Sequence, residues 1–136
     1  MRHEAELWVK DALYDLDCAR DMLEKRRHNY AVWFSRQAAE KMLKAGFLLL
    51  LKEPIPKEHN LLALGRTLLG EEETSLRAAL SFLNPHYTTT RYVDAAVGAP
   101  ADLYDEDSAR EAYRRSMEVI QWLGKKMGLD GLTRPG

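Results

Sequence analysis

The sequence predicts an all-α protein, an up-and-down bundle of about five helices, three long and two shorter. Two observations support this fold class. Apolar residues recur at spacings of three and four through most of the chain, and alternating β-branched runs are absent. The length of 136 residues, with 46% apolar and 30% charged residues, suits a single domain with one substantial core. Within a domain of residues 1–136, we expect the core over about 4–128 and a C-terminal tail over 129–136.

The first half of the chain is expected to form two long helices. An apolar stripe predicts the first helix over about residues 4–25. Asn29 can cap a second helix, which should continue to Leu51 before Pro54 ends it. Residues 45–51 are apolar on nearly every side, so we expect this second helix to be the central element of the bundle.

Two shorter helices should follow. One is expected over about residues 60–69, with Gly70 as its C-terminal stop. The next is expected to begin at the acidic run 71–73, because negative side chains favour a helix N-terminus, and to end near Leu83.

The last third of the chain contains a long loop and a helix. Residues 85–104 show no periodic pattern and are expected to form a loop, and loops of this length are often functional. Ser108 and Glu111 have the spacing of a capping box, which predicts the start of the last helix. Its end is expected at Gly128.

Charge, cysteine content and hydropathy exclude several classes of protein. Lys and Arg number 20 against 21 Asp and Glu, so no global field draws the chain to nucleic acid or anionic lipid. The lone Cys18 cannot form an intramolecular disulfide, which suits a reducing cytoplasm. The longest apolar run, 45–51, is far shorter than the roughly 20 residues of a membrane helix, so we expect neither secretion nor membrane association.

Motifs of common enzyme classes are missing. The sequence has no glycine-rich phosphate loop, nucleophile elbow or zinc-protease helix. The histidines at 3, 28, 59 and 86 include no i, i+4 pair, so neither a metal nor a cofactor is expected. In the second helix, Arg36, Glu40 and Lys44 are spaced by four. They form either an intrahelical ion-pair ladder or a polar groove at a dimer seam or ligand cleft.

Three stretches in order resemble the HEPN family. Its signature is similar to Trp33–Ala45 (WFSRQAAEKMLKA) and, after a proline-containing turn, to Glu58–Leu64 (EHNLLAL). Its Tyr-x-x-x-Arg-Tyr-Pro-Asp segment is similar to Tyr87–Asp94 (YTTTRYVD), with Val93 in place of proline. The resemblance covers about residues 4–128. It implies a helical up-and-down bundle, usually dimeric, in a group often encoded beside a minimal nucleotidyltransferase and proposed to bind nucleotides.

Some HEPN relatives are metal-independent ribonucleases. They use an Arg-x4-6-His motif, in which the cation and the imidazole of two subunits meet at the dimer seam. No arginine of this chain has a histidine five to seven positions later. Lys52 precedes His59 by seven, but lysine is a point charge and lacks the guanidinium fork. The missing motif argues against enzymatic activity.

The candidate ligand-binding residues are those able to hold a phosphate and stack a base. They are Arg36, Lys44, His59, Tyr87, Arg91, Tyr92 and Asp94. We expect Asp94 to orient the Arg91 guanidinium by a bidentate contact. The alternative is structural, with His59 flanking the third helix and the Arg91–Asp94 pair pinning the loop to the bundle.

Three functions remain open at this point. The first is a HEPN binding module that forms a homodimer and binds a nucleotide, RNA or a minimal nucleotidyltransferase in a toxin–antitoxin-like system. The second is a ribonuclease toxin with an unconventional site that uses His59. The third is a purely structural or assembly protein.

Overall fold

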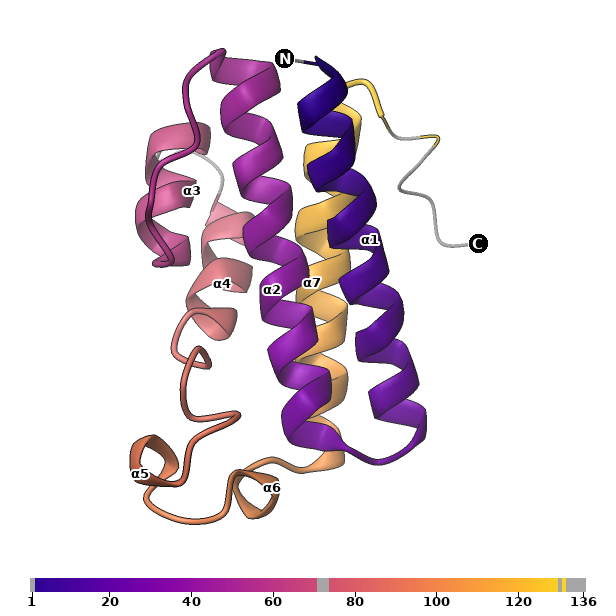
Figure 1. Cartoon of the computed structure of the whole chain (residues 1–136), viewed down its shortest axis with the longest axis vertical. Helices are drawn as coiled ribbons and strands as arrows, with labels where there is room; N and C mark the ends of the chain where they lie inside the picture. The colour runs from indigo at the N-terminus through magenta and orange to yellow at the C-terminus, as the bar shows by residue number, and fades with distance from the viewer. Residues whose placement is uncertain (1, 71–73, 130, 132–136) are drawn as a thin grey trace.

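The computed structural model describes residues 2–70, 74–129 and 131. Three long helices run side by side along the molecule: α1 (Arg2–Glu24), α2 (His28–Gly46) and α7 (Glu106–Lys126) (Figure 1). A π-helical turn, η1 (Phe47–Leu51), extends α2 without a break. Two shorter helices, α3 (Leu61–Leu69) and α4 (Thr74–Leu83), complete the bundle. The predicted all-α fold class is confirmed.

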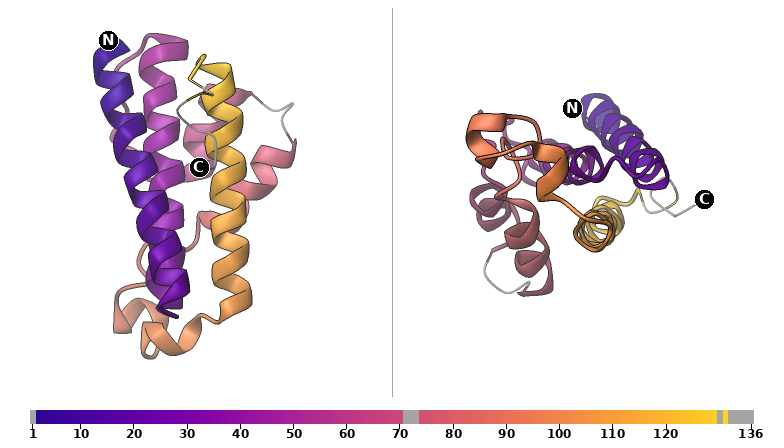
Figure 2. Two further views of the ribbon diagram at one scale, coloured as in Figure 1. Left: turned by 90° about the vertical axis from the view of Figure 1, so that its right-hand side faces the viewer. Right: turned by 90° about the horizontal axis from the view of Figure 1, so that it is seen from below.

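Helix α2 lies at the centre of the bundle, as its sequence predicts. It contacts α1 and α7 on one side and α3 and α4 on the other. The view along the bundle shows α3 and α4 separated from α1 by α2 (Figure 2). Gly46 allows α3 to come close, because a Cβ at this position would lie 2.6 Å from Cδ2 of Leu68. The segment before α3 also lies against α2, where His59 contacts Arg36 and Glu40.

Residues 85–104, which the sequence predicts to be an ordered or partly mobile loop, include short helical segments. They contain two one-turn helices, α5 (Val93–Ala96) and α6 (Pro100–Leu103), at one end of the bundle (Figure 1). A helix of one turn has no second turn over which a 3.6-residue period can repeat, so the sequence did not predict these two helices within the expected loop. Helix α5 ends at Val97, whose φ of 53° lies in the left-handed region.

Two predicted helix starts were also wrong in detail. Asn29 does not cap α2, because Arg27 is the N-cap residue and makes no capping bond through its side chain. The side chain of Asn29 instead donates from Nδ2 to the carbonyl of Thr90 at 3.0 Å. Helix α7 begins one turn earlier than expected, with Asp105 as N-cap and Ser108 as the third helical residue of its capping box.

The predicted helix ends agree better with the structure. Gly70 follows α3 and Gly128 follows α7, each with a φ of 72° that favours glycine. Asn60 caps α3 by accepting from the backbone amides of Leu62 and Ala63, both at 3.0 Å. The acidic run 71–73 lies outside the described residues, as does most of the expected tail over 129–136. No described helix has the combined length and apolar character that a bilayer span requires.

Candidate functional site

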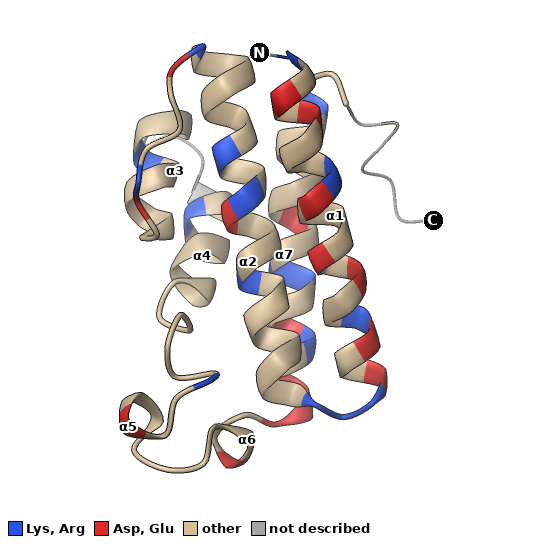
Figure 3. Cartoon of the chain, viewed as in Figure 1, with Lys and Arg blue, Asp and Glu red and all other residues tan. Residues whose placement is uncertain are grey.

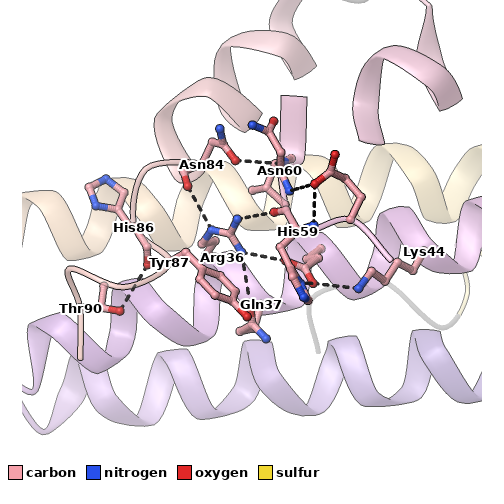
Figure 4. Close-up of polar contacts among 12 residues, drawn as sticks. Arg36, Gln37, Lys44, His59, Asn60, Asn84, His86, Tyr87 and Thr90 are labelled. Atoms are coloured by element: carbon pink, nitrogen blue, oxygen red, sulfur yellow. Dashed lines mark hydrogen bonds and ion pairs between the residues drawn. The ribbon is translucent and has the colours of Figure 1, made fainter. Parts of the chain in front are cut away.

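The candidate site lies on the edge of α2 that faces two connecting segments, residues 52–60 and 84–92 (Figure 4). Helical spacing of three and four places Trp33, Arg36, Glu40 and Lys44 in one row along this edge. His59 comes from the first connecting segment, and Tyr87, Arg91 and Tyr92 come from the second; the site therefore combines three parts of the chain.

The charged row of α2 is buried. Glu40 accepts from Nη1 of Arg36 at 2.8 Å and from Nζ of Lys44 at 3.0 Å, so two cations share one carboxylate. The side chains of these three residues are almost inaccessible, and Arg36 as a whole is only 1% exposed. The predicted ion-pair ladder exists, but it sits beneath the connecting segments. Breaking one member of such a buried set costs about 3–5 kcal/mol, far more than a solvated helix pair.

Arg36 joins α2 to both connecting segments. Its Nη2 donates to the backbone carbonyl of His59, and its Nε donates to that of Asn84 at 3.2 Å (Figure 4). The side chain of Asn84 in turn accepts from the amide of Leu61 at 2.8 Å and helps to begin α3. Arg36 is therefore buried beneath the site and holds the two connecting segments in place on α2.

His59 is held against this buried row although its own side chain is 56% exposed. Nδ1 lies 2.9 Å from Oε2 of Glu40, and the imidazole stacks on Tyr87 with ring centres 5.1 Å apart. An ionised carboxylate only accepts, so Nδ1 carries the hydrogen and, in the neutral ring, Nε2 is left as an acceptor.

Glu40 remains ionised despite its burial. Burial alone raises the pKa of a carboxyl group, because water no longer solvates the charge. Here the hydrogen bonds from His59, Lys44 and Arg36 outweigh that effect and leave the pKa of Glu40 below its usual value. A carboxylate at this position therefore fixes the His59 ring at neutral pH.

Arg91 lies on a platform of aromatic rings. Its Cζ is 3.7 Å from the centre of the Trp33 ring, 4.8 Å from that of Tyr92 and 5.2 Å from that of Tyr87. Nε and Nη2 both donate to the carbonyl of Tyr87, at 3.2 and 2.8 Å. Within the described part of the chain, Arg91 pairs with no carboxylate. Its charge is therefore fixed in place and uncompensated.

The contact expected between Arg91 and Asp94 is absent. Asp94 lies in the first turn of α5, is exposed, and makes no hydrogen bond or ion pair with a described residue. The guanidinium of Arg91 packs on aromatic rings and does not contact the Asp94 carboxylate that the sequence spacing suggested as its partner. The structure thus brings six of the seven candidate residues into one continuous cluster and leaves Asp94 outside it.

The cluster also depends on residues outside the predicted site. Trp33 forms the platform for Arg91, and its ring lies edge-on to Tyr87 with centres 5.4 Å apart. Glu40 connects His59 to the buried cations. The sequence places Trp33 and Glu40 in the same row of α2 as Arg36 and Lys44, because the spacing is three or four residues. Spacing alone, however, does not show which other segments pack on that face of the helix.

Comparison with known proteins decides the family. The model of the HEPN domain matches residues 5–127 of the chain. The chain belongs to the HEPN family. Among solved structures, this HEPN protein is similar to TT1696 from Thermus thermophilus, with 28% sequence identity and a TM-score of 0.79. It is also similar to ST0689, an archaeal HEPN homologue, with 27% identity and a TM-score of 0.77.

These likenesses extend over almost the whole molecule. In both cases the alignment covers 90% of this chain and 97% of the other chain. A search of curated proteins found no match. Among the described residues, no three or more His, Cys, Asp or Glu side chains gather closely enough to hold a metal ion.

Proposed function

We propose that this HEPN protein is a binding module for nucleotides, in which Arg91 contacts a phosphate group and the neighbouring tyrosines contact the base or sugar. The observation that carries the proposal is the guanidinium of Arg91, which has no carboxylate partner among the described residues and whose Cζ lies 3.7 Å from the centre of the Trp33 ring. A hydrogen bond between a charged donor and a phosphate is worth about 1.5–3 kcal/mol. Because two hydrogen bonds to Tyr87 already orient Arg91, little side-chain entropy remains to be lost on binding.

The other groups of the site have complementary roles in this proposal. Tyr92 is 49% exposed and offers a ring face for stacking. His59 presents an imidazole that is stacked on Tyr87 and held by Glu40, within reach of solvent. Arg36 and Lys44 are buried on Glu40, so they contribute positive potential and not direct contacts.

Calorimetry with ATP, GTP, AMP and a short single-stranded RNA tests the proposal. Arg91→Gln should weaken binding of the preferred ligand at least about tenfold, since it removes a charged hydrogen bond. Arg66→Gln is the matched control, because Arg66 is an exposed arginine on α3, away from the cluster. Absence of heat in every titration would contradict nucleotide binding.

A second candidate function rests on a separate observation, the exposed imidazole of His59 oriented by the buried carboxylate of Glu40 at 2.9 Å. This arrangement suits a general base, as a ribonuclease toxin needs to activate a ribose 2′-hydroxyl. RNA cleavage that survives purification and disappears in His59→Ala would favour it. Binding of RNA without cleavage, equal in wild type and His59→Ala, would leave only the binding module.

The proposal includes the partners expected for the family group. We expect a homodimer, and a minimal nucleotidyltransferase as the partner in a toxin–antitoxin-like system. Exposed apolar side chains on α2 and η1, such as Tyr30 and Leu50, offer surface for a second copy. Light scattering at micromolar concentration measures the dimer directly, and a monomer mass would contradict it. If neither nucleotide, RNA nor transferase binds, the purely structural role is favoured.

A further inference from the structure

We infer that the end of the bundle formed by α5 and α6 is a docking surface for a basic amphipathic helix of another protein. The surface consists of the apolar residues Tyr92, Val93, Val97 and Leu103 together with the carboxylates Asp94, Asp102 and Asp107. It adjoins the Arg91 cluster at Tyr92, but it does not depend on nucleotide binding there.

The apolar part of the surface is large for so short a segment. Tyr92, Val93, Val97 and Leu103 are all exposed, and Val97 reaches 90%. Helices α5 and α6 contact each other at one end of the molecule, so all four residues belong to this end (Figure 1). Apolar side chains that remain exposed to solvent do not stabilise the fold, whereas a partner that covers them removes their apolar surface from water, which favours binding.

The charge of the same segment selects the partner. Residues 92–109 carry five carboxylates and neither lysine nor arginine. Two of the five are engaged, since Asp105 caps α7 and Glu106 pairs with Arg110 at 3.3 Å. Asp94, Asp102 and Asp107 form no ion pair with a described residue. In Figure 3, red positions lie on α5, on α6 and at the start of α7. An apolar surface among unpaired carboxylates complements an apolar stripe flanked by Lys or Arg.

The secondary structure of the surface favours a helix as the bound partner. Both α5 and α6 are helical, and the described residues include no strand with which an extended peptide could pair along an edge. Recognition must therefore use side chains, and an amphipathic helix presents apolar anchors at i, i+3, i+4 and i+7 on one face.

The outer face of α1 serves as a contrast. It also exposes apolar side chains, Leu7 and Tyr14. Between them, however, lies Lys10, and Asp11 is paired with Lys41 at 2.7 Å. Asp15 shares Lys41 with Asp11, and Glu4 on the same face forms no ion pair with a described residue, while Lys10 offsets one of these charges. That face therefore carries less unpaired negative charge than the α5–α6 surface, and it provides matched control positions.

The test uses the full chain and two synthetic amphipathic helices of about 18 residues, one of leucine and lysine and one of leucine and glutamate. Calorimetry should show the basic peptide binding with a dissociation constant on the order of 10 μM and the acidic peptide not binding. Val97→Asn combined with Leu103→Ser should weaken binding at least tenfold. Asp94→Asn combined with Asp102→Asn should weaken it about three- to tenfold and reduce its salt dependence.

The variants are chosen so that loss of folding does not imitate loss of binding. Asparagine adopts the left-handed conformation of Val97 more readily than valine does, so Val97→Asn should melt no lower than wild type. The control pair Leu7→Ser and Tyr14→Ser should bind the basic peptide as wild type does. None of these substitutions touches Arg91, so nucleotide titrations report separately on the proposed function.

Several results would overturn the inference. Equal affinity for the two peptides would mean unspecific apolar contact, and equal losses in the α1 control would mean general attraction to an acidic protein. Binding of neither peptide would remove the surface as a docking site. If wild type is dimeric and Val97→Asn with Leu103→Ser is monomeric, a second copy covers the surface and the proposed partner is wrong.

Discussion

Arg36 and Arg91 contact the same tyrosine ring, yet the protein treats their charges in opposite ways. Their Cζ atoms lie 4.8 and 5.2 Å from the centre of the Tyr87 ring. Arg36 is buried, paired with Glu40 and bonded to two backbone carbonyls. Arg91 is partly exposed and has no carboxylate among the described residues. The comparison separates a guanidinium that stabilises the fold from one that is available to a ligand.

The largest effect is expected for Arg36→Met. This substitution keeps much of the side-chain volume but breaks the buried ion pair and leaves the carbonyls of His59 and Asn84 without their donor. We expect a loss of about 3–5 kcal/mol in the free energy of unfolding, and a fall in melting temperature of roughly 10 °C or more. Thermal and urea denaturation measure both quantities. A loss below about 1 kcal/mol would contradict the structural role assigned to Arg36.

Glu40 in the same buried row should make the free energy of unfolding depend on pH. The pKa of Glu40 is lowered in the folded state from an ordinary value of 4.5. The unfolded chain therefore binds the proton more readily, so the stabilisation is complete above about pH 4.5 and is lost as the pH falls through the lowered folded pKa. Urea denaturation between pH 3 and 7 should show a smaller acid loss in Glu40→Gln than in wild type, although the variant is less stable at pH 7. Parallel curves would contradict this linkage.

Arg91→Met should cost much less stability than Arg36→Met. It removes two bonds to the Tyr87 carbonyl and the cation–π contact with Trp33, which together are worth about 1–2 kcal/mol at a partly exposed site. Ligand affinity should nevertheless fall at least about tenfold. Melting curves and calorimetry on the same samples give the two numbers. If the melting temperature falls as far as in Arg36→Met while the folded fraction binds ligand normally, the Arg91 cluster is structural.

The smallest effect is expected for Asp94→Ala. Asp94 contacts neither Arg91 nor another described residue, so its removal should change the free energy of unfolding by no more than about 0.5 kcal/mol. Nucleotide affinity should be unchanged or slightly higher, since a negative charge near the site is removed. A large loss of stability in this variant would instead support the ion pair between Arg91 and Asp94 that the sequence spacing suggested.

The sequence by itself determined the features that depend on neighbouring residues. Helical periods located the three long and two shorter helices, Gly70 ended α3, and the spacing of Arg36, Glu40 and Lys44 implied their ladder. The ordered HEPN motifs predicted the family, and the match to the HEPN domain over residues 5–127 confirms it. These patterns are legible because helix hydrogen bonds and i, i+4 contacts join residues only a few positions apart.

Tertiary structure alone decided which partners the polar groups found. Asn29 bonds the carbonyl of Thr90, 61 positions away, and does not cap its own helix. Arg91 packs on Trp33 of α2, which is distant in the sequence, and does not pair with Asp94, which follows it by three residues. Arg36 binds two backbone carbonyls, which every residue type possesses and no side-chain motif reveals. These polar groups become buried, and so require such partners, only when distant segments of the chain pack together. A pattern of neighbouring residues therefore cannot predict the partners.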